Sequence, residues 1–197
     1  MTKIVASITT SVDGYITGPN DGPDRGLGEG GERLHYWVFG GAWSYAEDAR
    51  GEATGADREF LDQAMKRQGA VIGGRNTYEA ADHWGGENPW GLPFFILTHR
   101  LQDEPDGAFT FVNGLDEALA RAREAAGDKD VSIMGGADVI RQALRAGLVD
   151  ELSVSIAPVV LGAGKRLFEG FDQMISLEHI RVLQSPFATH ISYRVVR

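Results

Sequence analysis

Short apolar runs and longer amphipathic segments alternate along most of the chain. Strands are predicted for the apolar runs rich in β-branched and aromatic residues, at 3–9, 70–74, 93–100, 109–112 and 131–136. Helices are predicted where apolar residues recur at helical spacing before a glycine, at 53–69, 115–127 and 137–147. Such alternation is typical of a largely parallel sheet covered by helices, so we expect a three-layer α/β fold.

The pattern changes after Asp150, where strand-like segments follow one another without helices between them. These segments lie at residues 151–162, 176–185 and 189–196. We expect them to close the sheet with antiparallel hairpins. The chain has 197 residues and shows no internal repeat or low-complexity linker. Residues 1–197 are therefore expected to form a single domain.

Residues 19–52 depart from this alternation and are rich in glycine and aromatic residues. This composition suits a long loop with aromatic anchors, so we expect an insertion or lid at about 19–52. Its aromatic side chains include Trp37, Phe39, Trp43 and Tyr45. They could stack on a flat heterocyclic ligand, or they could form a small core or a contact between subunits.

Composition and charge exclude several classes of function. Apolar residues make up 43% of the chain and charged residues 24%, as in ordinary globular proteins. The formal net charge of -9 argues against binding to nucleic acid or to an anionic membrane, because such surfaces need a basic face. Absence of cysteine excludes disulfides, thiolate metal sites and cysteine nucleophiles. The first residues lack the apolar core of a signal peptide, and no run reaches membrane-spanning length, so we expect a cytoplasmic protein.

Two strand-to-helix junctions carry glycine pairs, GGRNT at 73–77 and GGADV at 135–139. A helix N-terminus presents free N–H groups, and glycine lets a phosphate approach the backbone closely. Arg75 could clamp a phosphate and Thr77 could donate its hydroxyl, while Gly135 and Gly136 could admit a pyrophosphate. Either glycine pair alone could simply permit a tight turn, but two such junctions in one sheet favour a dinucleotide site. Neither junction matches the GxGxxG or GxxxxGK[ST] motif.

These motifs, in this order, resemble the dihydrofolate reductase fold family. The resemblance rests on SVDGYI at the end of the first strand, GGRNTYE, IMGGADVI and DELSVSIAPVVLGAGKRLF, and it covers nearly the whole chain except residues 19–52. It is closest to the branch that contains the C-terminal reductase domain of riboflavin biosynthesis. The resemblance implies a mostly parallel sheet of about eight strands, NADPH as hydride donor, and a substrate placed over the nicotinamide near the first strand.

The resemblance also implies which residues bind the cofactor. Ala6 and Ile16 would hold the nicotinamide carboxamide through their backbones, beside a loop shaped by Asp13 and Gly14. The segment containing Gly74, Arg75 and Thr77 would reach the cofactor phosphates. Thr98 and Arg100 would lie near the adenosine ribose and its 2′-phosphate, for which a nearby arginine is needed. The pyrophosphate would be cradled by Gly135, Gly136, Ala137, Asp138 and Val139. In many members this glycine pair contains a cis peptide bond.

The substrate side offers fewer candidates. Dihydrofolate reductases carry one acidic residue early in the helix before the GRxT strand, and Asp57 is the matching candidate for a catalytic residue. Asp57 could equally be a plain helix N-cap. Met134 stands where riboflavin-pathway reductases commonly carry glutamate, which puts a ribityl-pyrimidine substrate in doubt. His35 and His83 have no partner at metal-ligand spacing, so no metal is predicted.

The sequence therefore predicts an NADPH-dependent oxidoreductase that transfers hydride to a small heterocycle, either pterin-like or pyrimidine-like. The alternative is a nucleotide-binding or sensor protein that kept the phosphate sites without turnover. The apolar strand around SVSIAPVV could be covered by a second subunit, so a homodimer is also expected.

Overall fold

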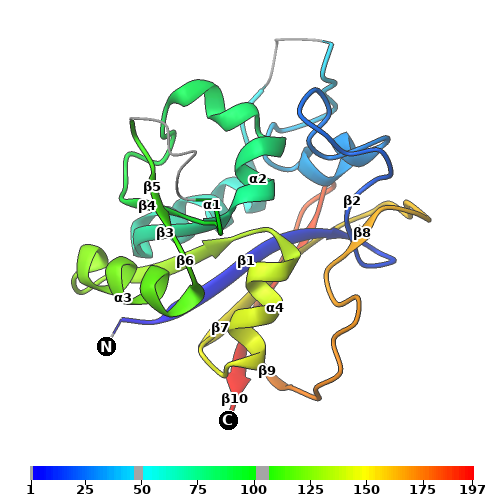
Figure 1. Ribbon diagram of the computed structural model, residues 1–197. Coiled ribbons are helices and arrows are strands. Elements are labelled where there is room, and N and C mark those ends of the chain that lie inside the picture. The colour runs from blue at the N-terminus through cyan, green and yellow to red at the C-terminus, as the bar shows by residue number, and fades with distance from the viewer. Residues whose placement is uncertain (1, 47–50, 101–106) are drawn as a thin grey trace.

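Eight strands form one sheet in the computed structural model, in the order β5-β4-β3-β6-β1-β7-β10-β9 (Figure 1). The structure describes residues 2–46, 51–100 and 107–197. The strands of this sheet are β1 (Ile4–Ser11), β3 (Gln68–Gly74), β4 (Phe94–Leu97), β5 (Thr110–Val112), β6 (Asp130–Met134), β7 (Glu151–Ala157), β9 (Ser176–Gln184) and β10 (Thr189–Val196). All neighbours from β5 to β7 pair in parallel, and β10 pairs antiparallel with both β7 and β9. The predicted mostly parallel sheet with antiparallel C-terminal strands is confirmed.

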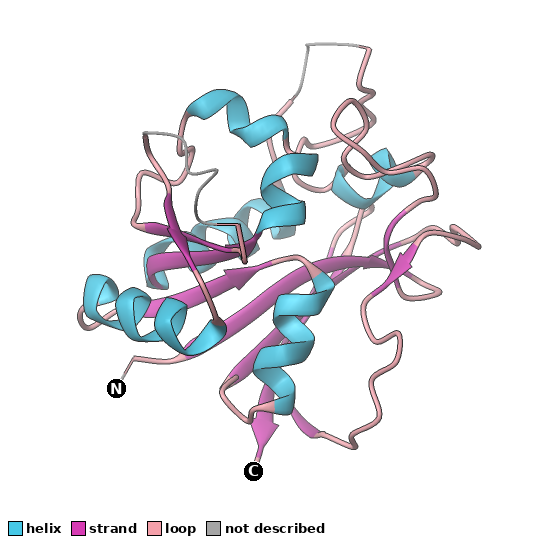
Figure 2. Cartoon of the chain, in the orientation of Figure 1, coloured by secondary structure: helices cyan, strands magenta, loops and turns pink. Residues whose placement is uncertain are grey.

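Helices cover both faces of the sheet, as Figure 2 shows. They are α1 (Gly55–Arg67), α2 (Arg75–Ala80), α3 (Leu115–Ala126) and α4 (Ala137–Arg145). Neighbouring residues of a strand point to opposite faces, and on β3 Ile72 packs with α3 and α4 while Val71 packs with Tyr78 of α2. Two buried cores on opposite faces make the three layers. Within the described residues, no helix has the length and apolar character that crossing a membrane requires.

Helix α1 differs from its prediction at both ends. Its N-cap is Thr54 rather than Asp57, because Asp57 lies in the first turn with its side chain turned into the core. At the other end, the helix stops at Arg67, and Gly69 already belongs to β3. A Cβ on Gly69 would lie 2.7 Å from the carbonyl oxygen of Ala126. Gly69 therefore permits close contact with the end of α3 rather than ending α1.

The predicted insertion is packed onto the rest of the fold where the structure describes it. It follows β2 (Tyr15–Thr17), which pairs with β8 (Lys165–Arg166), and it contains the short 3-10 helix η1 (Gly31–His35). Trp37 packs edge-on against the rings of Phe60 and His190. Trp37 is thus a core residue, which is one of the roles considered for the aromatic residues of the insertion. Residues 47–50 of the insertion lie outside the described part of the chain.

Phe39, Trp43 and Tyr45 of the insertion form a small group of their own. The Trp43 ring contacts the rings of Phe39 and Tyr45, at centroid distances of 5.2 and 4.9 Å. The Tyr45 hydroxyl accepts a hydrogen bond from the backbone N–H of Leu27. Trp43 is buried, so this group also has the character of a core.

Candidate functional site

The glycine pair after β6 lies at the start of α4. Its peptide bond, Gly135-Gly136, is cis, as the resemblance implies. Gly135 has φ +63°, a conformation that glycine adopts without steric conflict, and Gly136 is the N-cap of α4 without a side-chain hydrogen bond. The first backbone N–H groups of α4 are thus left without a capping side chain.

The junction between β3 and α2 lies directly against this glycine pair. A Cβ placed on Gly136 would lie 3.1 Å from Thr77 Oγ1, and one on Gly74 would lie 3.1 Å from Val139 Cγ2. The contact arises because β3 and β6 are parallel neighbours, so their carboxyl ends meet at one edge of the sheet. The structure therefore brings together the two predicted junctions, and a side chain at either glycine would crowd the neighbouring junction.

The end of β1 forms the third wall of this region. Pairing of β1 with β6 ends at Ser7 and Met134, whereas pairing with β7 continues to Ser11 and Ala157. Past Ser7, β1 faces the glycine pair, and Ile8 Cδ1 would lie 3.5 Å from a Cβ on Gly135.

Ala6 lies within the sheet rather than at this end of β1. It is fully buried and is paired with Ile133 on one side and with Leu152 on the other. Its backbone is therefore surrounded by neighbouring strands, and Ile8 is closer to the glycine pair than the predicted Ala6.

Asp13 and Gly14 hold the loop between β1 and β2. The Asp13 carboxylate accepts hydrogen bonds from Ser11 Oγ and from the backbone N–H groups of Leu161 and Gly162. The Ser11 hydroxyl and these backbone donors lower the pKa of Asp13 to about 2. Gly14, at φ +84°, accepts a backbone bond from Leu167 through its carbonyl. The two residues thus tie the loop that leads into β2, where Ile16 is half-buried, to the segments on both sides of β8.

The two predicted phosphate-binding arginines, Arg75 and Arg100, both contact Glu79. Glu79 was not among the residues predicted from the sequence. Glu79 Oε1 lies 2.9 Å from Arg75 Nε and 2.7 Å from Arg100 Nη2. Arg75 also donates from Nη1 to the Arg100 carbonyl, and the Arg100 backbone N–H donates to Oγ1 of buried Thr98. The hydrogen bond from Arg75 and the charges of both arginines lower the pKa of Glu79. Its position four residues after Arg75 was the available signal, because residues at that spacing share one helix face.

Asp57 does not face these residues but lies in the core with His190 and Ser155. His190 Nε2 lies 2.8 Å from Asp57 Oδ1, and His190 Nδ1 lies 2.7 Å from Ser155 Oγ. Burial lowers the pKa of His190 in spite of the opposing effect of Asp57. With a neutral ring and an ionised Asp57, Nε2–H donates to the carboxylate and the Ser155 hydroxyl donates to Nδ1. All three residues are 1–2% exposed, so this Ser-His-Asp set is not open to a substrate.

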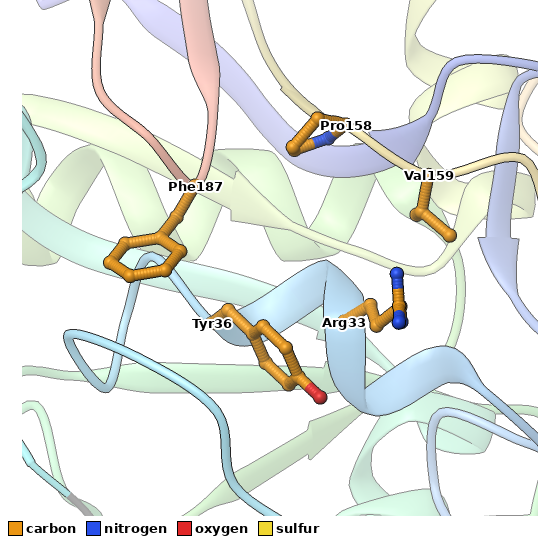
Figure 3. A pocket seen from close by; sticks show the side chains of 5 residues that line it. All are labelled: Arg33, Tyr36, Pro158, Val159 and Phe187. Carbon is orange, nitrogen blue, oxygen red and sulfur yellow. The ribbon is translucent and has the colours of Figure 1, made fainter.

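A pocket lies at the carboxyl end of β7, apart from the predicted cofactor residues (Figure 3). Its lining combines η1, the segment after β7 and the turn between β9 and β10, and comprises Arg33, Tyr36, Pro158, Val159 and Phe187. The Arg33 guanidinium points toward Val159 in this view. In the described ranges, 2–46, 51–100 and 107–197, no group of three or more His, Asp or Glu side chains could hold a metal ion.

The chain is similar to several proteins over nearly its full length. A family model described as the RibD C-terminal domain matches residues 2–188. The uncharacterized protein YyaP of Bacillus subtilis is 28% identical over 193 residues, covering 90% of this chain and 86% of that protein.

Solved structures show the same fold. A protein from Shewanella sp. PV-4, provisionally named as a riboflavin biosynthesis protein, superposes with a TM-score of 0.72 at 23% identity, covering 100% of both chains. Dihydrofolate reductase from Enterococcus faecalis, in complex with NADP(H), superposes with a TM-score of 0.62 at 15% identity, covering 98% of this chain and 96% of that one. The chain therefore belongs to the RibD C-terminal domain family and has the dihydrofolate reductase-like fold.

Proposed function

We propose that this protein is a reductase that binds NADPH at the carboxyl edge of the sheet and transfers hydride to a small heterocyclic substrate. The observation that carries the proposal is the meeting of two glycine junctions, at Gly74 and at Gly135-Gly136, beside the Glu79 arginine cluster. The family and the NADP(H) complex of the Enterococcus faecalis enzyme support it.

The described residues fit a dinucleotide in two places. At the start of α4, Gly136 provides no capping side chain, so the first backbone N–H groups of the helix would bind the pyrophosphate. The proposed pyrophosphate cradle comprises Gly74, Thr77, Gly135, Gly136, Ala137, Asp138 and Val139. Arg75 and Arg100, next to Thr98, would bind the 2′-phosphate, because guanidinium groups form strong charge-assisted bonds to phosphate.

NADPH would supply the hydride, and the protein would position the two rings. The nicotinamide carboxamide would meet the backbone of β1 near Ile8, in place of the expected Ala6, and that of Ile16. Ile8 borders the glycine pair, and Asp13 fixes the loop that leads into β2, the strand of Ile16. Orientation of this kind accounts for much of the acceleration of hydride transfer.

Asp57 is better explained as part of the fold than as a catalytic acid. Its side chain is 3% exposed, and one carboxylate oxygen is already bonded to His190. A residue that protonates substrate must come within hydrogen-bond reach of it. Asp57 could do so only if the surrounding core opened.

The substrate we propose is a pterin-like or pyrimidine-like ring, and turnover is the test. NADPH consumption would be followed at the nicotinamide absorbance band with a panel of dihydropterins and ribosylamino-pyrimidines. Oxidation that depends on one of these compounds supports the reductase. NADPH binding without turnover of any compound would instead support the nucleotide sensor, which the burial of Asp57 favours.

We further propose a homodimer that covers β9. This strand is at the edge of the sheet, none of its residues is buried, and its apolar Leu177 and Val182 are 39% and 53% exposed. Paired edges are a common way of protecting such strands.

Light scattering after gel filtration tests this interface. Wild-type protein is expected to have the mass of two chains, and Val182→Lys the mass of one, because lysine at an edge strand opposes pairing. Val12→Lys is the control, since Val12 is 62% exposed and lies outside β9. A monomeric wild type, or a dimeric Val182→Lys variant, would contradict the interface.

A further inference from the structure

Glu79 is held between two arginines that come from different parts of the chain. Its Oε1 atom accepts from Arg75 Nε at 2.9 Å, within α2, and from Arg100 Nη2 at 2.7 Å, three residues beyond the end of β4. Arg75 in turn donates to the carbonyl oxygen of Arg100 at 3.2 Å. One carboxylate oxygen therefore joins the ends of two neighbouring strands.

The two arginine side chains differ in how firmly the rest of the fold holds them. The Arg75 side chain is 15% exposed and lies over the Phe111 ring, with its guanidinium carbon 5.9 Å from the ring centroid. The Arg100 side chain is 54% exposed, and among the described residues its hydrogen-bond partner is Glu79. A long exposed side chain loses rotamer freedom when it is fixed, so Arg100 needs such an anchor.

The negative charge of Glu79 also helps to hold Arg75 and Arg100 next to each other. Two guanidinium groups that share one acceptor oxygen repel each other, and the Glu79 carboxylate offsets that repulsion. The cluster keeps one net positive charge and presents two planar, multidentate groups at one edge of the sheet. Such an arrangement suits a phosphate monoester, whose oxygens accept several charge-assisted bonds at once.

We propose that Glu79 is a positioning residue that sets the preference of this site for a 2′-phosphorylated over an unphosphorylated adenosine ribose. This inference rests on the proposed function, because it assigns the arginine cluster to the 2′-phosphate end of the cofactor. Glu79 touches neither the phosphate nor the reacting atoms. It acts by keeping Arg100 beside Arg75, where both guanidinium groups reach the same phosphate.

The dissociation constants of NADPH and NADH, measured by isothermal titration calorimetry, test the role of Glu79. Glu79→Ala is expected to raise the NADPH constant about tenfold, the loss typical of one charged hydrogen bond, and to leave the NADH constant unchanged. Glu79→Gln keeps an acceptor oxygen at the same place but removes the negative charge, so it is expected to lose less of the preference than Glu79→Ala. Glu117→Ala is the matched control, because Glu117 forms the same type of i,i+4 pair with Arg121 on α3.

A double-mutant cycle separates positioning from simple charge removal. If Glu79 acts through Arg100, then Glu79→Ala has little further effect on the NADPH preference in an Arg100→Ala background. Unchanged or tighter NADPH binding by Glu79→Ala would overturn the inference, because it would mean that the carboxylate only repels phosphate. A loss in Glu79→Gln as large as in Glu79→Ala would also overturn it. Failure of the wild type to bind either nucleotide would instead remove the proposed function itself.

Discussion

His190 shows how a single residue can join separate parts of this fold. Its two ring nitrogens connect α1 through Asp57 and β7 through Ser155, and its ring stacks on Phe60 at a centroid distance of 4.3 Å. Trp37 of the insertion packs on the same ring and donates to Thr9 Oγ1 of β1. The insertion is thus attached to the sheet through one buried polar network.

Replacing His190 by alanine is expected to lower the free energy of unfolding by about 3 kcal/mol. The substitution leaves buried Asp57 and Ser155 without their partner and removes a stacked ring. Chemical denaturation with urea measures the change. His99→Ala is the control, because the His99 ring is exposed, away from β9, and hydrogen-bonded to Asn113 at the surface, and it is expected to change stability by less than about 0.5 kcal/mol. An equal effect of the two substitutions would contradict the role given to the network.

The same residue predicts a pH dependence. Because burial lowers the pKa of His190 below its ordinary 6.5, the unfolded chain takes up a proton at a higher pH than the folded chain. The stabilisation is therefore complete above about pH 6.5 and is lost as the pH falls from there toward the lower folded pKa. The difference in unfolding free energy between wild type and His190→Ala should shrink over that range. A difference that grows as the pH falls would contradict this assignment.

At the scale of elements, the candidate site depends on how closely two strand-to-helix junctions approach each other. Gly74 ends β3, and a side chain there would press on Val139 in the first turn of α4. Gly74 has an ordinary extended conformation, so its requirement is for space rather than for a special φ angle.

Gly74→Ala is expected to separate these junctions slightly and to raise the NADPH dissociation constant. Overpacking at such a contact shifts the backbone at a cost in stability of about 1–3 kcal/mol, and displaced junctions should bind NADPH more weakly. Adding Val139→Ala removes the contacting methyl groups and should restore most of the affinity. Fluorescence titration of the single and double variants measures this. An additive loss in the double variant would show that the contact is unimportant.

Elements set by local sequence patterns could be predicted, whereas contacts between distant residues could not. The strands and the two junctions could be read from local patterns, because alternation, glycine pairs and helix periodicity are all short-range signals. The positions of His190 and Trp37 in their network could not, since their partners lie far away along the chain. For Glu79, spacing signals the bond to Arg75, but no local pattern signals the bond to Arg100 on another element. The N-cap prediction for Asp57 failed for the same reason. Its partner, His190, lies 133 residues away.

At the scale of the whole molecule, the two ends of the parallel strands, which form the amino and carboxyl edges of the sheet, are built differently. The amino edge is closed by ion pairs, in which Lys3 and Arg67 contact Glu151 and Arg67 also contacts Asp130. Burial alone would raise the pKa of Glu151, but the hydrogen bonds from Lys3 and Arg67 outweigh it and lower the pKa. The carboxyl edge carries the glycine junctions and the arginine cluster. In parallel α/β sheets ligands bind at the carboxyl edge, which agrees with the proposed placement.

The central claim is that this edge binds NADPH, and an equilibrium titration of the purified protein with NADPH and NADH tests it most directly. The account predicts saturable binding of both nucleotides, with NADPH bound more tightly because of Arg75 and Arg100. It also predicts that Arg75→Ala weakens NADPH binding by about tenfold or more, as expected for a lost charged contact to phosphate. Absence of binding by either nucleotide, or equal NADPH affinity of wild type and Arg75→Ala, would contradict the account.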